Sequence, residues 1–178
     1  MPNLKGFRQY DEHDVVNLFS YSGDSTLVYK GTAVKVAGGL DLGSDTGGIE
    51  DLGSIGNSYS NTVSSRFGVA AKVAPAGGTD AVLGLTLMDI RELDENGEKL
   101  VYNPRKAAEM GVVVSGQAVP VLTRGIVTYV GLTGNAGASV YLGSNGALNT
   151  TSTSNTKVGK LLSSASASTD PVLLKLEL

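Results

Sequence analysis

Residues 125–162 read GIVTYVGLTGNAGASVYLGSNGALNTTSTSNTKVGKLL. Short apolar runs alternate here with clusters of glycine, asparagine, serine and threonine. The runs have the length of β-strands and are too short for ordinary helices. The clusters between them contain the residue types that tight turns favour. The stretch therefore predicts several short strands joined by turns.

The same alternation continues on both sides of this stretch. From Gly125 to the end of the chain, the expected strands are Gly125–Val130, Ser139–Leu142, Ala147–Thr150, Val158–Leu162 and Val172–Leu178. Those expected before it are Val15–Tyr21, Leu27–Val36, Ser65–Val73, Ala81–Ile90, Val112–Val114 and Val119–Thr123. A turn cluster separates the first two of these, which predicts a hairpin. Strands at such regular spacing favour an all-β fold, either a small barrel or a sandwich.

One hairpin and one short helix are expected in the middle of the chain. Asp94-Glu95-Asn96-Gly97 lies between two strand-like runs, and Asn-Gly is a strong hairpin signal. Residues 104–111 then predict the only helix. Asn103 can cap its start, Pro104 suits its first position, and Gly111 can end it.

Glycine is concentrated in residues 37–62, which contain seven glycines and no lysine or arginine. We expect a long loop there, and long loops in compact domains are usually functional or disordered. Residues 1–14 are polar and predict an N-terminal arm. The expected organisation is thus an arm (1–14), an N-terminal β region (15–80) and a barrel-like body (81–178).

Composition narrows the functional classes. The chain has 178 residues, no cysteine, one histidine and a net charge of −3. Cysteine chemistry and sites that need two imidazoles are therefore excluded within one chain. The negative charge argues against non-specific nucleic-acid binding. The sequence shows neither a signal peptide nor an apolar run long enough to span a membrane, so we expect synthesis in a cytoplasm.

Three groups of acidic residues contain side chains of the kind that form metal-binding or catalytic sites. Asp11-Glu12-His13-Asp14 could touch a metal, although an ordinary solvated arm explains it better. The acidic residues of the glycine-rich loop could bind calcium, but their spacing matches no calcium motif. Asp89, Glu92 and Asp94 could supply a glycosidase pair, yet they equally suit the exposed side of a charged hairpin. We therefore expect no catalytic residues, no metal and no cofactor.

The last third of the chain carries very little charge. Its charged residues from Gly125 onward are Lys157, Lys160, Asp170, Lys175 and Glu177. Exposed strand edges with little charge tend to pair with other chains. A protein that assembles can use this property, so the composition favours assembly.

Two stretches resemble a known family. They are GLTLMDIRELDENGEKLVYNPRKAAEMGVVVSGQAVPVLTRGIVTY (84–129) and GASVYLGSNGALNTTSTSNTKVGKLLSSASASTDPVLLKLEL (137–178). Their apolar strands, the sequence Ala138-Ser139-Val140-Tyr141, the pair Val158-Gly159 and the closing strand resemble the decoration, or cement, proteins of tailed bacteriophages. These two stretches cover about half of the chain, and the first 80 residues match no family pattern.

The resemblance implies a β-barrel or sandwich on the outer surface of an expanded phage capsid. It implies a virion protein, usually a homotrimer, that binds the major capsid protein and stabilises the shell against internal pressure. The alternatives are another phage structural or surface-binding module, such as a head-fibre base, a tail-associated domain or an adhesin, and an enzyme or small-ligand domain.

The expected contact residues come from three segments. They are Phe7, Arg8 and Tyr10 in the arm, Ile49 and Ile55 in the glycine-rich loop, and Arg105 and Lys106 on the short helix. Aromatic rings supply buried area at interfaces. Glycine allows a loop to approach a surface closely. The two cations on the helix could meet an acidic partner.

Overall fold

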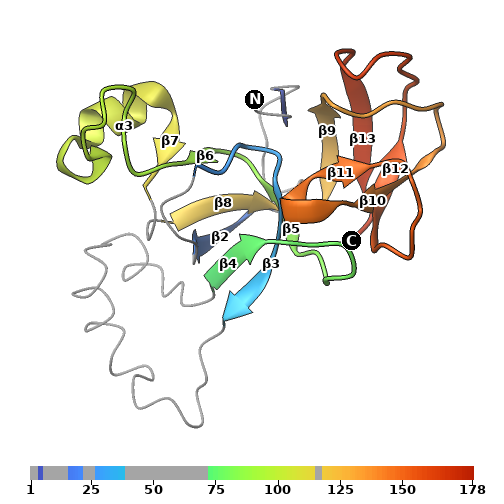
Figure 1. Cartoon of the computed structure of the whole chain (residues 1–178), viewed down its shortest axis with the longest axis horizontal. Helices are drawn as coiled ribbons and strands as arrows, with labels where there is room; N and C mark the ends of the chain where they lie inside the picture. The colour runs from blue at the N-terminus through green and yellow to red at the C-terminus, as the bar shows by residue number, and fades with distance from the viewer. Residues whose placement is uncertain (1–3, 6–15, 22–26, 39–71, 115–117) are drawn as a thin grey trace, which may run out of the picture.

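The computed structural model describes residues 4–5, 16–21, 27–38, 72–114 and 118–178 (Figure 1). Everything said below about structure concerns these residues. Their strands are β1 (Leu4–Lys5), β2 (Val16–Tyr21), β3 (Ala33–Gly38), β4 (Lys72–Pro75), β5 (Gly84–Thr86), β6 (Asp89–Ile90), β7 (Val112–Val113), β8 (Ala118–Leu122), β9 (Gly125–Tyr129), β10 (Ser139–Leu142), β11 (Leu148–Asn149), β12 (Lys157–Leu161) and β13 (Val172–Leu176). The helices are α3 (Pro104–Met110) and two single 3₁₀ turns, η2 (Leu100–Tyr102) and η3 (Ser144–Gly146).

Five strands close a small barrel in the order β2-β4-β3-β5-β8. Strand β2 pairs antiparallel with β8 along most of its length, and parallel with β4 at Ser20 and Tyr21. The barrel interior is apolar, with fully buried Val34, Val73 and Val119. Burial of such branched side chains is the main stabilising contribution.

A six-stranded antiparallel sheet lies beside the barrel, in the order β1-β9-β13-β12-β10-β11 (Figure 1). The two-residue strand β1 forms one edge and pairs with the last two residues of β9. Part of the segment predicted as a free arm is thus an edge strand of this sheet.

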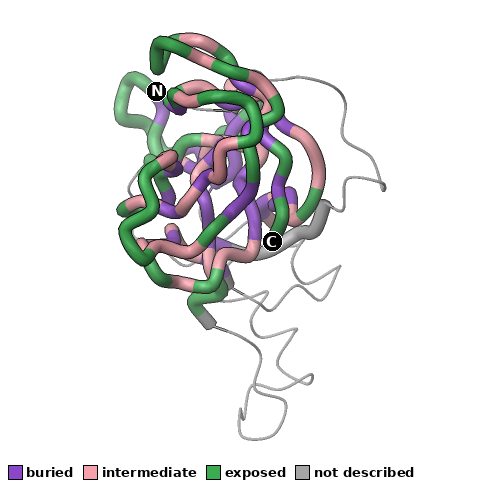
Figure 2. Tube along the Cα trace, turned by 90° about the vertical axis from the view of Figure 1, so that its right-hand side faces the viewer, coloured by how far each residue is buried: buried purple, intermediate pink, exposed green. Residues whose placement is uncertain are grey.

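The barrel and the sheet share one core. Ala33, Leu85 and Leu122 of the barrel belong to the same buried cluster as Tyr129 and Leu174 of the sheet. In Figure 2 the buried segments, drawn in purple, accordingly lie in the middle of the molecule, and exposed segments lie around them. The sheet and barrel therefore bury each other, which links residues far apart in the sequence.

The all-β class with a small barrel and a short helix is confirmed. The expected hairpin between 15–21 and 27–36 is wrong, because β4 lies between β2 and β3 in the barrel. Residues 81–90 do not form one strand either, but two short strands, β5 and β6, in different sheets. Local patterning marks where strands occur, but partners are chosen by long-range packing.

The boundary expected at residue 80 stays a prediction. Strands β5 and β8 come from the part predicted as a separate body, yet they complete the barrel with β2, β3 and β4. Among the described residues, no helix is long and apolar enough to cross a membrane.

Candidate functional site

Between β5 and β8 the chain leaves the barrel and forms a small unit, residues 89–114, which we call the helical excursion. It contains the parallel pair β6–β7, the turn η2 and helix α3, and it extends from one side of the molecule (Figure 1). The excursion has its own small core of Leu100, Ala107, Val112 and Val114. A short helix is unstable alone, so this packing is what holds α3 in place.

A tight turn forms the tip of the excursion, as the Asn-Gly pair predicted. Leu93 and Lys99 form an antiparallel bridge across it, and Gly97 has a φ of 83°. One carboxylate oxygen of Asp94 accepts hydrogen bonds from the backbone N–H groups of Asn96 and Glu98, both at 2.8 Å. Asp94 therefore fixes the turn from inside.

Asp94 also connects this turn to the helix. Its second carboxylate oxygen forms an ion pair with the Lys106 ammonium, and Asp94 is only 5% exposed. The hydrogen bond from Lys106, helped by those from Glu98 and Asn96, lowers the pKa of Asp94 to about 2. The same hydrogen bond raises the pKa of Lys106. The expectation that Asp94 lies on an exposed side is thus wrong, because the turn folds back over α3.

Helix α3 has the ends that its sequence predicted. The Asn103 side chain accepts a hydrogen bond from the Lys106 N–H at 3.1 Å, and Pro104 occupies the first turn. Gly111 ends the helix in the left-handed region, with φ at 63°. The cap and the terminal glycine both satisfy backbone groups that a helix end leaves unpaired.

The two cations predicted as contact residues differ in their surroundings. The side chain of Arg105 is 88% exposed and reaches Glu109 one turn along the helix, at 3.1 Å. Lys106 is instead directed at Asp94 within the excursion. Arg105 is thus exposed to solvent, whereas Lys106 is held within the excursion by its ion pair.

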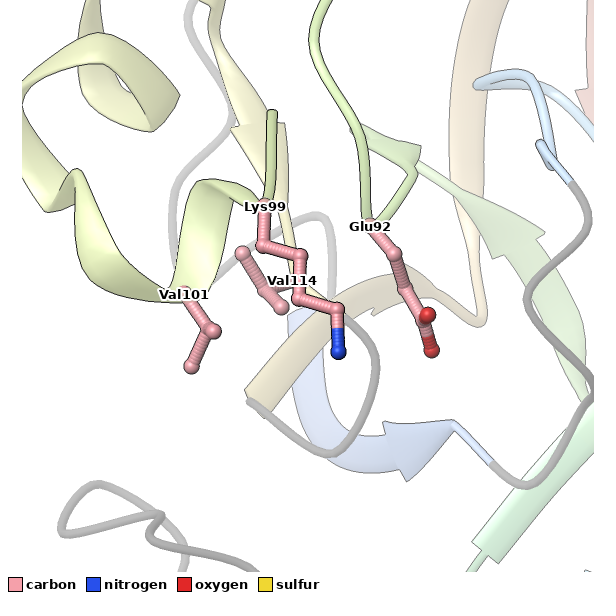
Figure 3. Close-up of a pocket in the computed structure, with 4 residues that line it drawn as sticks. All are labelled: Glu92, Lys99, Val101 and Val114. Atoms are coloured by element: carbon pink, nitrogen blue, oxygen red, sulfur yellow. The ribbon is translucent and has the colours of Figure 1, made fainter. Parts of the chain in front are cut away.

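A shallow hollow lies beside the tip and is lined by Glu92, Lys99, Val101 and Val114 (Figure 3). Its volume is about 200 Å³. Lys99 and Glu92 approach from neighbouring segments, and Figure 3 shows their charged ends extending in the same direction. A small open hollow with mixed charge suits a surface contact better than an enclosed ligand.

Three apolar side chains of the excursion are exposed, and one of them, Val101, lines this hollow. Leu93, Val101 and Tyr102 are 45%, 48% and 82% exposed. The sequence pattern does not single out these three residues, because it predicts strand-like runs on both sides of the 94–97 turn. The signal that could have found Tyr102 is its place directly before Asn103 and Pro104, which start the helix.

Two of the three carboxylates considered for catalysis, Asp89 and Asp94, have structural partners. Asp89 accepts a hydrogen bond from the backbone N–H of Lys30 at 2.7 Å, and Asp94 is engaged as described above. Within the described residues, no group of three or more histidine or acidic side chains could hold a metal ion.

Several predicted residues lie outside the described part of the chain. These are the expected contact residues Phe7, Arg8, Tyr10, Ile49 and Ile55, the run 11–14, and the acidic residues of the 37–62 loop. Their roles stay predictions.

Comparison with known families gives a match to part of the chain. Residues 96–176 match the model of a family described as phage cement protein. The resemblance to the phage cement proteins is confirmed. Neither a search of curated proteins nor one of solved structures gave a significant match.

The phage cement match includes most of the excursion and all of β7 to β13, and it ends at residue 176. It leaves out the barrel strands β2 to β5. The match supports a structural, capsid-binding role on the virion. Of the exposed apolar residues of the excursion, Val101 and Tyr102 lie within the matched residues, whereas Leu93 lies before them.

Proposed function

We propose that this chain binds the outer surface of an expanded phage capsid and stabilises the shell against the pressure of the packaged DNA. The observation that carries the proposal is the cement-protein match over residues 96–176. A protein that binds only the expanded shell stabilises that state by mass action. Repetition over many equivalent shell sites increases the total effect.

The tip of the helical excursion is the part of the described surface best suited to this contact. Tyr102 is almost fully exposed, and Leu93 and Val101 of the same excursion are exposed apolar residues too. Tyrosine and arginine often dominate binding energy at interfaces. Arg105 lies on the following helix α3, and its side chain is also exposed.

The wider contact set includes residues outside the described structure. We propose that Phe7, Arg8 and Tyr10 of the arm lie across a neighbouring subunit, and that Ile49 and Ile55 follow the shell surface. The partner is the major capsid protein, and the chain assembles as a homotrimer. Light scattering should then give three times the chain mass of 18.2 kDa.

Co-sedimentation with shells of the source virus tests the function. The purified chain is mixed with expanded shells and with unexpanded shells, and the bound fraction is measured. We expect saturable binding to expanded shells alone. If neither form binds, the capsid role fails, and a tail-associated or other surface-binding role becomes the better explanation.

The same assay locates the contact. Tyr102→Ser should weaken binding about tenfold or more, as expected for an exposed aromatic anchor, without changing the melting temperature. Tyr29→Ser is the matched control, since Tyr29 is also exposed but lies outside the excursion. Equal binding by both variants would remove Tyr102 from the interface. The pair Phe7→Ala and Tyr10→Ala tests the arm in the same way.

A further inference from the structure

Four of the few charged residues near the C-terminus gather at one place. Lys157 and Lys160 lie on β12, Lys175 lies on β13, and Glu177 follows β13 directly. The three ammonium groups are 3.2, 4.0 and 3.5 Å from the Glu177 carboxylate, in that order. We call these three lysines the lysine cluster. The sequence spacing did not reveal it, because the β12–β13 pairing brings the residues together.

The cluster has an arrangement that stability alone does not favour. Lys160 and Lys175 are directly opposite each other in the antiparallel ladder. Like charges in such positions destabilise a sheet. The side chains of both residues are about half exposed, at 47% and 52%. Ion pairs at exposed positions contribute little to folding. Folding therefore gives no strong reason to place two lysines here.

Among the described residues, the cluster holds more positive charge than negative charge. There, three ammonium groups share the single carboxylate of Glu177, which leaves two positive charges in excess of it. The hydrogen bond from Lys157 and the charges of all three lysines lower the pKa of Glu177, so it is ionised at neutral pH. Each ammonium has three N–H donors, so the cluster can donate hydrogen bonds to further carboxylates.

We propose that the lysine cluster is a second contact surface, which binds a carboxylate-rich patch on the capsid shell. This inference rests on the proposed function. A carboxylate is the ligand that the cluster already holds, in the form of Glu177. The chain as a whole has a net charge of −3, which disfavours a long nucleic acid as the occupant.

The position of the cluster in the molecule fits a cementing role. Strands β12 and β13 lie at the opposite end of the long axis from α3 (Figure 1). A chain with contact surfaces at both ends can touch two neighbouring shell subunits. Binding energy at each end then resists their separation.

The test compares two double variants with the same net charge. Lys160→Gln with Lys175→Gln removes the opposed pair, and Lys30→Gln with Arg124→Gln removes two positive charges outside both the cluster and the helical excursion. Binding to expanded shells is measured at about 50 mM and about 500 mM NaCl, because salt screens exposed charges. We expect the cluster variant to bind about tenfold more weakly at low salt, with a flatter salt dependence. The control should stay within about twofold of the wild type.

Thermal unfolding of the free chain separates a binding role from a structural one. The cluster variant should melt at the same temperature as the wild type or higher, because the opposed like charges are gone. A clear fall in its melting temperature would make the cluster structural and overturn the proposal. Binding equal to that of the control would overturn it too, while shell binding by the wild type would still support the proposed function.

Competition identifies the occupant. Poly-L-glutamate should displace the wild type from shells. For the cluster variant, it should have no more effect than polyethylene glycol, which is the control competitor. If duplex DNA at equal charge competes better than poly-L-glutamate, the cluster recognises phosphates and the proposal of a carboxylate-rich patch is wrong.

Discussion

Asp94 shows how one buried carboxylate can position a surface. It accepts hydrogen bonds from two N–H groups of its own turn and pairs with Lys106 on α3. Removing one member of a buried pair leaves the other without compensation, which is costly. The position of the 94–97 turn in the excursion that carries Tyr102 therefore depends on Asp94, which is itself buried.

Asp94→Asn should lower the melting temperature at pH 7 by several degrees, because the amide cannot pair with the Lys106 ammonium. Asp94 has a folded-state pKa of about 2, below its ordinary value of 3.8. A lowered pKa stabilises the fold at pH values above the ordinary one, and this contribution is lost as the pH falls toward 2. The difference between wild type and variant should thus shrink between pH 4 and pH 2 in thermal unfolding.

Glu95→Gln is the control for that measurement, since Glu95 is exposed in the same turn. A difference between the Asp94 variant and the wild type that is constant across this pH range would contradict the role assigned to the ion pair.

At the scale of elements, helix α3 depends on its ends and on its packing. It has seven residues, and within it only Ala107 is fully buried. The side-chain cap from Asn103 and the glycine at position 111 therefore make a large relative contribution. The helix in turn supplies Lys106 to the turn, so the two elements stabilise each other.

Asn103→Ala should reduce the free energy of unfolding by about 1 kcal/mol, because the N–H of Lys106 loses its side-chain acceptor. Urea unfolding measures this change. Asn103→Asp keeps an acceptor at the same position and should stay close to the wild type. Equal losses in both variants would mean that the cap is not what stabilises the helix.

Strand pairing in the sheet also explains a sequence motif. The pair Val158-Gly159 is part of the resemblance to cement proteins. A Cβ at position 159 would collide with the backbone carbonyl oxygen of Lys175 on β13. The glycine is therefore needed for β12 and β13 to approach, and this approach also forms the lysine cluster.

At the scale of the whole molecule, the chain begins and ends in the same sheet. Strand β1 pairs with β9, which pairs on its other side with the closing strand β13. The barrel strand β2 follows β1 in the sequence but belongs to the other sheet. Strand β1 therefore pairs with the part of the chain that resembles cement proteins.

A disulfide can test this pairing, since the natural chain contains no cysteine. Lys5 and Thr128 are register partners, and Cα atoms of antiparallel partners lie within disulfide range. Lys5→Cys with Thr128→Cys should form a bond within one chain under oxidising conditions and raise the melting temperature. Non-reducing gels and mass spectrometry detect it.

Lys5→Cys with Ser152→Cys is the matched control, because Ser152 lies in an exposed segment outside the β1–β9 pair. Failure of the first pair to form a bond would place β1 elsewhere. A bond found only between chains would show that β1 is exchanged between copies.

The sequence by itself determined the all-β class, the turn at 94–97, helix α3 with its caps, and the resemblance to phage cement proteins. These features depend on neighbours along the chain, where turn chemistry, capping and apolar runs act directly. Only the tertiary structure decided that β2 pairs with β4 and β8, that Asp94 is buried against Lys106, and that three lysines surround Glu177. Those contacts join residues from different elements, and the free energy of burying a shared core selects them rather than any local preference.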